Sequence, residues 1–120
     1  METPRMYIVV NSELEMSPGK IAAQCAHSAC KVTEYLEHVN NFNYSNWKKN
    51  GYTKIVLHGK QKDLIKLIQK YDDTTLPIFC RSTYDAGKTE IPEGSLTTIA
   101  FAPMLMSERP QLLKKMNLLN

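Results

Sequence analysis

The first feature of the chain is a set of four short apolar runs, at residues 6–10, 55–57, 76–82 and 96–102. Each is rich in β-branched or aromatic side chains, which favour extended backbone. The first run, Met6 to Val10, is apolar at every position. A continuous run of this kind is typical of a strand covered on both faces of its sheet. The pattern therefore predicts four strands, and Pro103 ends the last of them.

Between the first two runs, apolar residues recur every three or four positions, which is the spacing of one helix face. Ser17-Pro18, a capping residue followed by proline, predicts where this helix begins. The asparagine-rich residues 40–46 end it, and a short helical turn around Trp47 follows. The predicted buried face consists of Ile21, Cys25, Ala29, Val32, Leu36 and Val39.

A second amphipathic helix is predicted over residues 61–71, with Leu64 and Leu67 among its inward side chains and a row of lysines outside. The tail is predicted to be helical from Ser107 to about Leu113, with Pro110 tolerated in the first turn. Strands that alternate with helices indicate an α/β fold whose sheet is covered by helices on both sides. The last two strands are joined by a loop, which predicts a mixed sheet. We expect one domain over residues 1–120.

Composition narrows the class of protein. Hydrophobic residues make up 42% of the chain, as in globular proteins, and its longest apolar run near the start is too short for a signal peptide or a membrane span. The three cysteines form no CxxC or zinc-ligand pattern, so we expect neither a disulfide framework nor a metal site. A reduced, cytoplasmic compartment is the simplest interpretation. The sequence leaves the oligomeric state open, a homodimer included.

The charge is unevenly distributed along the chain. The net charge is +3, yet residues 48–70 carry seven lysines against Asp63 alone. Such a stretch suits contact with a phosphate backbone, with Lys62, Lys66 and Lys70 on one helix face. The alternative is a solvated lysine face with no partner.

Two clusters of residues could carry chemistry. At about 100° per residue, Lys20, Gln24, His27 and Lys31 fall within one arc of the first helix, which could bind an anion or be an ordinary polar flank. The second cluster is the loop of residues 85–95, which follows a strand end and combines a carboxylate, an ammonium and hydroxyls with glycines. Neither cluster has the spacing of a Walker loop or a dinucleotide fingerprint.

Together these clusters resemble the signatures of the archaeal and eukaryotic peptidyl-tRNA hydrolases. Residues 19–29, Gly-Lys-Ile-Ala-Ala-Gln-Cys-Ala-His-Ser-Ala, resemble the family's helix start, and Asp-Ala-Gly-Lys-Thr-Glu-Ile at 85–91 with Gly-Ser-Leu-Thr at 94–97 resembles its loop. The resemblance extends from Met6 to Pro103. It implies a three-layer α/β/α sandwich around a four-stranded mixed sheet.

The resemblance also implies an activity, the hydrolysis of the ester in peptidyl-tRNA without a metal or other cofactor. Carried over position by position, the family's proposed catalytic residues are Lys20, Asp85, Thr89 and Thr97. We expect Asp85 to position or deprotonate a water and Lys20 to pair with Asp85 and hold developing negative charge. The threonines would hydrogen-bond the water, the ribose or the carbonyl. Supporting or tRNA-binding residues would be Gln24, His27, Lys31, Lys62, Lys66, Lys70 and Lys88.

The chain departs from the family's sequence pattern at four positions. Asn11 stands where the family has arginine, Pro18 where it has lysine, Lys88 where it has arginine, and Glu90 where it has glutamine. Lysine lacks the bidentate phosphate recognition of arginine, and Glu90 adds negative charge near a polyanion. These changes favour an alternative, a non-catalytic module of the same fold that binds tRNA or a protein.

Overall fold

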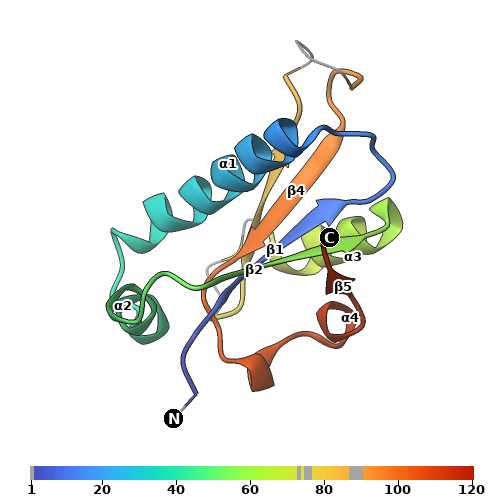
Figure 1. Ribbon diagram of the computed structural model, residues 1–120. Coiled ribbons are helices and arrows are strands. Elements are labelled where there is room, and N and C mark those ends of the chain that lie inside the picture. Colours follow the sequence, from blue (N-terminus) through green and yellow to red (C-terminus); the bar gives the residue numbers. More distant parts are fainter. Residues whose placement is uncertain (1, 73, 75–76, 87–90) are drawn as a thin grey trace.

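The computed structural model describes residues 2–72, 74, 77–86 and 91–120, and a mixed sheet forms its centre (Figure 1). The sheet has five strands in the order β3-β4-β1-β2-β5. β1 pairs in parallel with β2 and antiparallel with β4, and β3 pairs antiparallel with β4. The strands are β1 (Met6–Asn11), β2 (Lys54–Gly59), β3 (Cys80–Tyr84), β4 (Leu96–Phe101) and β5 (Asn117–Leu118).

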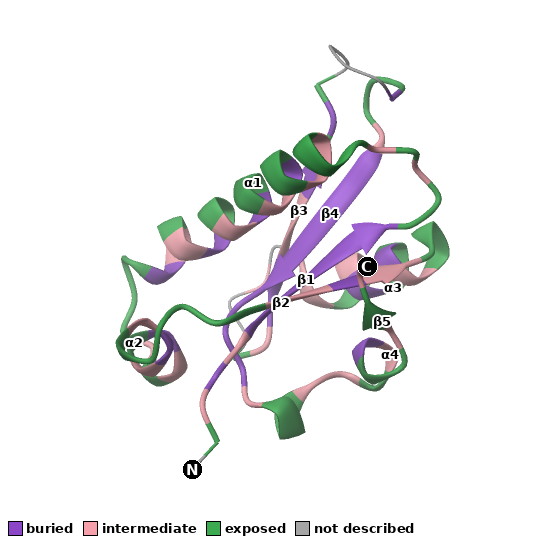
Figure 2. Cartoon of the chain, in the orientation of Figure 1, coloured by how far each residue is buried: buried purple, intermediate pink, exposed green. Residues whose placement is uncertain are grey.

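The central strand β1 is buried along its whole length, as its apolar run predicts. Its side chains alternate between two hydrophobic clusters, because successive residues of a strand point to opposite faces. Met6 and Ile8 pack with α1 (Pro18–Leu36), whereas Tyr7 and Val9 pack with α3 (Gln61–Tyr71). Figure 2 shows β1 and β4 as the buried centre, with exposed helix surfaces outside them.

Both long helices begin as their sequences predict. Ser17 Oγ accepts a hydrogen bond from the backbone N–H of Lys20 (3.3 Å), and Pro18 occupies the first helical position. The helix ends at Leu36 instead of Val39, which is exposed. In α3, Leu64 is buried with Leu67, and the lysines lie outside. The short helix α2 (Phe42–Lys49) is capped by Asn41, whose side chain accepts from the N–H of Tyr44 (2.8 Å).

The predicted inner face of α1 is only partly correct. The buried residues are Gln24, Ser28, Val32 and Leu36, whereas Ile21, Cys25 and Ala29 are half-buried. The stripe is polar at the start of the helix because the adjoining strands offer hydroxyl and carbonyl partners there.

The prediction of four strands is wrong, because the tail adds a fifth. The tail forms no continuous helix. It consists of a 3-10 turn η1 (Met106–Glu108), the short helix α4 (Gln111–Lys114) and β5, which pairs antiparallel with β2. Arg109 and Pro110 are extended between the two helical pieces, since a residue before proline avoids the helical region and proline lacks an N–H. The third strand also begins later than predicted, at Cys80.

Candidate active site

The first half of α1 is held on the sheet by buried hydroxyl groups. Ser28 Oγ lies 2.6 Å from Thr83 Oγ1 on β3 and 2.7 Å from Thr98 Oγ1 on β4. Thr98 Oγ1 donates to the carbonyl of Gln24 (2.9 Å). All four residues are buried. Because buried polar groups need partners, these bonds fix the position of the helix along and across the strands.

Thr97 joins this network through a bulge in β4. The strand register pairs Thr83 with Thr98 but Tyr84 with Leu96, so Thr97 is an extra residue opposite β3. Thr97 is fully buried, and its Oγ1 donates to the carbonyl of Thr83 (2.9 Å) and accepts from Gln24 Nε2 (2.9 Å). This predicted site residue therefore contacts Gln24 and the strand beside it.

The start of α1 meets the end of β3 at an ion pair. Lys20 Nζ donates to Asp85 Oδ1, which joins residues 65 positions apart. The Lys20 side chain is 14% exposed and that of Asp85 only 2%. The backbone N–H of Asp85 donates to the carbonyl of Ser95 (2.8 Å), and its carbonyl accepts from the N–H of Gly94 (3.0 Å). These backbone bonds fix the position of Asp85, and its buried carboxylate contacts the partly exposed ammonium of Lys20.

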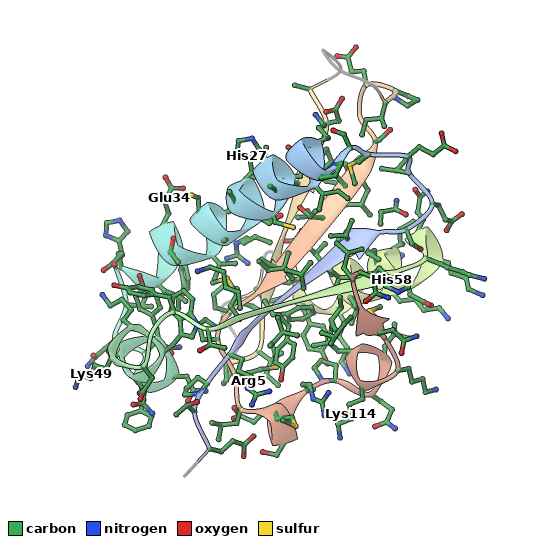
Figure 3. The ribbon with its side chains drawn as sticks, viewed as in Figure 1. Arg5, His27, Glu34, Lys49, His58 and Lys114 are labelled. Carbon is green, nitrogen blue, oxygen red and sulfur yellow. The ribbon has the colours of Figure 1, made fainter. Side chains whose placement is uncertain are left out.

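The other residues of the predicted helix arc divide between inside and outside. Gln24 points inward, one turn after Lys20. His27 is exposed and projects from the outer face of α1, away from the sheet (Figure 3). Lys31 is exposed, and its Nζ donates to the carbonyl of Ser82 on the edge strand β3 (2.8 Å). The structure brings Lys20 and Asp85 together, and Thr97 is bonded to Gln24, one helical turn after Lys20. Two further predictions, Lys88 and Thr89, lie outside the described residues.

The predicted basic stretch is divided in space. Lys62, Lys66 and Lys70 are exposed on α3, which begins at the end of the sheet where β1 and β2 finish. Lys48 and Lys54 lie toward the other end. Lys48 pairs with Glu37 (3.3 Å), and Lys54 Nζ lies 5.1 Å from the centre of the Trp47 ring. The start of α3 is therefore at the same end of the sheet as Asp85, and its lysines lead away from that end.

Asn11 is a structural residue that the sequence did not reveal. It is fully buried at the end of β1, and its Nδ2 donates to the carbonyl of Leu96 (2.9 Å) and to Gln61 Oε1 (3.2 Å). Glu13 Oε2 accepts from the N–H of Gln61 (2.7 Å) at the start of α3. These bonds join β1, β4 and α3 beside the candidate site. A polar residue directly after an unbroken apolar run was the available signal.

Other chemistry receives less support. Burial raises the pKa of the Cys25 thiol, which keeps it protonated and makes it a poor nucleophile. Within the described part of the chain, His, Cys, Asp and Glu side chains do not gather in threes as a metal site would need. The helices described here include none that is long and apolar enough to cross a membrane.

Comparison with known proteins identifies the family. The family model described as peptidyl-tRNA hydrolase PTH2 matches residues 4–119. A peptidyl-tRNA hydrolase of Sulfolobus acidocaldarius is 38% identical, over 82% of this chain and 86% of its own length. One from Methanococcus maripaludis is 30% identical, over 93% and 96%. A probable peptidyl-tRNA hydrolase 2 of Schizosaccharomyces pombe is 34% identical over 82% of this chain, which spans about half of that relative's length (48%). The chain belongs to the peptidyl-tRNA hydrolase PTH2 family.

Proposed function

We propose that this chain hydrolyses the ester that joins a peptide to the terminal ribose of a tRNA, releasing peptide and tRNA. The observation that carries the proposal is the contact between Lys20 and Asp85, a buried carboxylate and a nearly buried ammonium at the end of the sheet. The family match adds that relatives over most of this length are named as enzymes of this reaction.

Asp85 and Lys20 have complementary roles in the proposed mechanism. Asp85 accepts a hydrogen bond from the attacking water, positions it and takes its proton as the water oxygen bonds to the carbonyl carbon. That proton passes to the ribose oxygen when the ester bond breaks. Lys20 fixes the carboxylate and stabilises the negative charge that grows on the carbonyl oxygen. Thr89 would hydrogen-bond the water or the ribose. Thr97 acts through Gln24, since its proton is donated to Thr83.

Three further properties belong to this proposal. Helices on both faces of the sheet support the three-layer α/β/α arrangement expected of the family. A cytoplasmic location follows from a substrate that arises during translation. The formation of a homodimer, which the sequence leaves open, would appear in light scattering as a doubling of the molar mass as the protein concentration rises.

The test is ester release from an N-acetylated aminoacyl-tRNA. We expect the wild-type chain to release the acyl group and Asp85→Ala to do so more slowly by a factor on the order of 10² or more. Glu34→Ala, which removes an exposed acid from the far half of α1, is the control and should keep the wild-type rate. Tight tRNA binding by the wild type without any release would instead support the binding module.

The lysines of α3 are our candidates for contact with tRNA phosphates. Changing Lys62, Lys66 and Lys70 to glutamate should weaken tRNA binding and lower the slope of log affinity against log salt by up to about three. The matched control changes Lys48, Lys49 and Lys54 to glutamate, which alters the charge equally at the other end of the sheet. Equal losses for the two triple variants would show that the attraction is unspecific.

A further inference from the structure

A hollow of about 390 Å³ lies between the start of α3 and the base of the loop that carries Asp85. Its lining consists of Gln61 and Ile65 from α3, Tyr84 and Leu96 from the strand ends, and Glu93, Gly94 and Ser95 from the loop before β4. Tyr84 precedes Asp85, and Ser95 accepts the hydrogen bond of the Asp85 backbone. The volume is within the usual range of small-ligand pockets. The hollow therefore lies against the backbone segments next to Asp85.

Tyr84 is the most informative side chain of this hollow. It is 52% exposed, although it lies on a strand whose next residue, Asp85, is buried. Successive strand residues point to opposite faces, so Tyr84 lies toward α3 while Asp85 lies toward α1. Ile65 on α3 is 40% exposed and lines the same hollow. A tyrosine ring and an aliphatic side chain that both face solvent offer surfaces on which a nucleobase can stack.

The polar groups around this hollow suit the rest of a nucleotide. The amide of Gln61 is held by Asn11, whose Nδ2 donates to its Oε1, and an amide can hydrogen-bond the edge of a base. Lys62 and Lys66 directly follow Gln61 and Ile65 on α3 and are exposed. They form the next row of side chains outward from the hollow, where phosphates of a bound strand would lie.

We propose that this hollow binds the terminal nucleoside of the tRNA, with its base stacked on Tyr84. The inference rests on the proposed function, because the ribose that carries the ester must lie beside Asp85 when water attacks. A larger hollow of about 530 Å³, lined by residues of α1 and α2, contains neither Asp85 nor its neighbours and does not meet this condition.

The test compares uncharged tRNA with the same tRNA lacking its terminal adenosine, so binding is measured without catalysis. For the wild-type chain, removing the adenosine should weaken binding about 10-fold, or about 1.4 kcal/mol, because the stacking of one base on Tyr84 is lost. For Tyr84→Ala the two tRNAs should bind equally, whereas Tyr84→Phe should behave as wild type. Tyr52→Ala is the matched control, because Tyr52 is also 52% exposed and lies in another part of the molecule.

A second variant, Ile65→Asp, places negative charge in the hollow and should also abolish the difference between the two tRNAs. The proposal is overturned if Tyr84→Ala and Ile65→Asp both keep the wild-type preference for the terminal adenosine. It is also overturned if their defect appears only with a longer peptide on the tRNA, which would make the hollow a peptide site. Absence of ester release by the wild type refutes the proposed function alone, since the binding comparison does not depend on turnover.

Discussion

The two halves of α1 use the same helical stripe for different purposes. Gln24 and Ser28 in the first half are buried against threonines of β3 and β4, and Lys20 ahead of them reaches Asp85. Val32 and Leu36 in the second half are buried among apolar side chains. All four buried residues are spaced by four positions, so they share one face. The helix therefore changes from a polar to an apolar contact along its length.

This difference shows how a helix can be both stable and accurately placed. Apolar contact is non-directional, so the second half contributes stability without fixing one position closely. Hydrogen bonds between buried groups are directional, and a displaced helix would leave Ser28 or Thr98 without a partner at a cost of about 1–3 kcal/mol. We infer that the polar half sets where Lys20 lies.

The largest expected effect comes from the apolar half. Leu36→Ala should lower the free energy of unfolding by about 2–5 kcal/mol, because it removes a buried side chain and leaves a cavity. The turnover of the remaining folded enzyme should stay near the wild-type value. Urea denaturation and rates per folded molecule measure the two quantities. Val39→Ala, at an exposed position beyond the helix end, is the control and should change stability by less than about 0.5 kcal/mol.

A smaller loss of stability, with a loss of activity, is expected from the polar half. Ser28→Ala should cost about 1–3 kcal/mol, because hydroxyls of Thr83 and Thr98 lose a partner. Turnover should fall on the order of 10-fold, since small displacements of a catalytic group are costly. Ser28→Thr keeps the hydroxyl and should recover part of the rate. If Ser28→Ala lost stability but kept full turnover, the two halves would not differ as we infer.

The smallest effect concerns Tyr44, which packs beyond the apolar half. Burial, together with its hydrogen bond to Glu37 (2.6 Å), raises the pKa of Tyr44 to about 12. An unfolded tyrosine loses its proton near pH 10, so the stability due to this group is complete below pH 10 and is lost as the pH rises toward 12. Tyr44→Phe should show a shallower fall in melting temperature between pH 9.5 and about 12. Tyr84→Phe, which changes an exposed ring at the end of β3, should retain the wild-type slope.

Local patterns predicted most of the fold, because each corresponds to a local physical preference. The capping pair Ser17-Pro18, the unbroken run of β1 and the lysine face of α3 all occur as expected. The fifth strand was missed because two residues carry no periodicity, and it exists only through its pairing with β2. Pro110 divided a tail that its hydrophobic content alone suggested was one helix.

The candidate site was predictable in part for a related reason. The two motifs indicated Lys20 and Asp85, which form an ion pair across 65 positions. Ser28 could not be identified, since a polar residue on a core face is informative only when its distant partner is known. Asn11 gave a signal as the polar residue directly after the apolar run of β1, but its partners on β4 and α3 are distant in sequence. The prediction of the buried face of α1 was partly wrong because threonine hydroxyls on β3 and β4 form hydrogen bonds with Ser28 and Gln24, which allows these polar side chains to be buried.

The bulge at Thr97 changes which face of the sheet the side chains of β4 point to. Leu96, Ile99 and Phe101 all belong to the cluster on the α3 side, although three positions separate the first two. In a regular strand such a separation would place Leu96 and Ile99 on opposite faces. The extra residue resets the alternation, which allows the neighbouring threonines 97 and 98 both to serve α1. Deleting one of these two threonines would leave Leu96 and Ile99 two positions apart, so a regular strand could keep both on the α3 side, but only one threonine hydroxyl would then face α1.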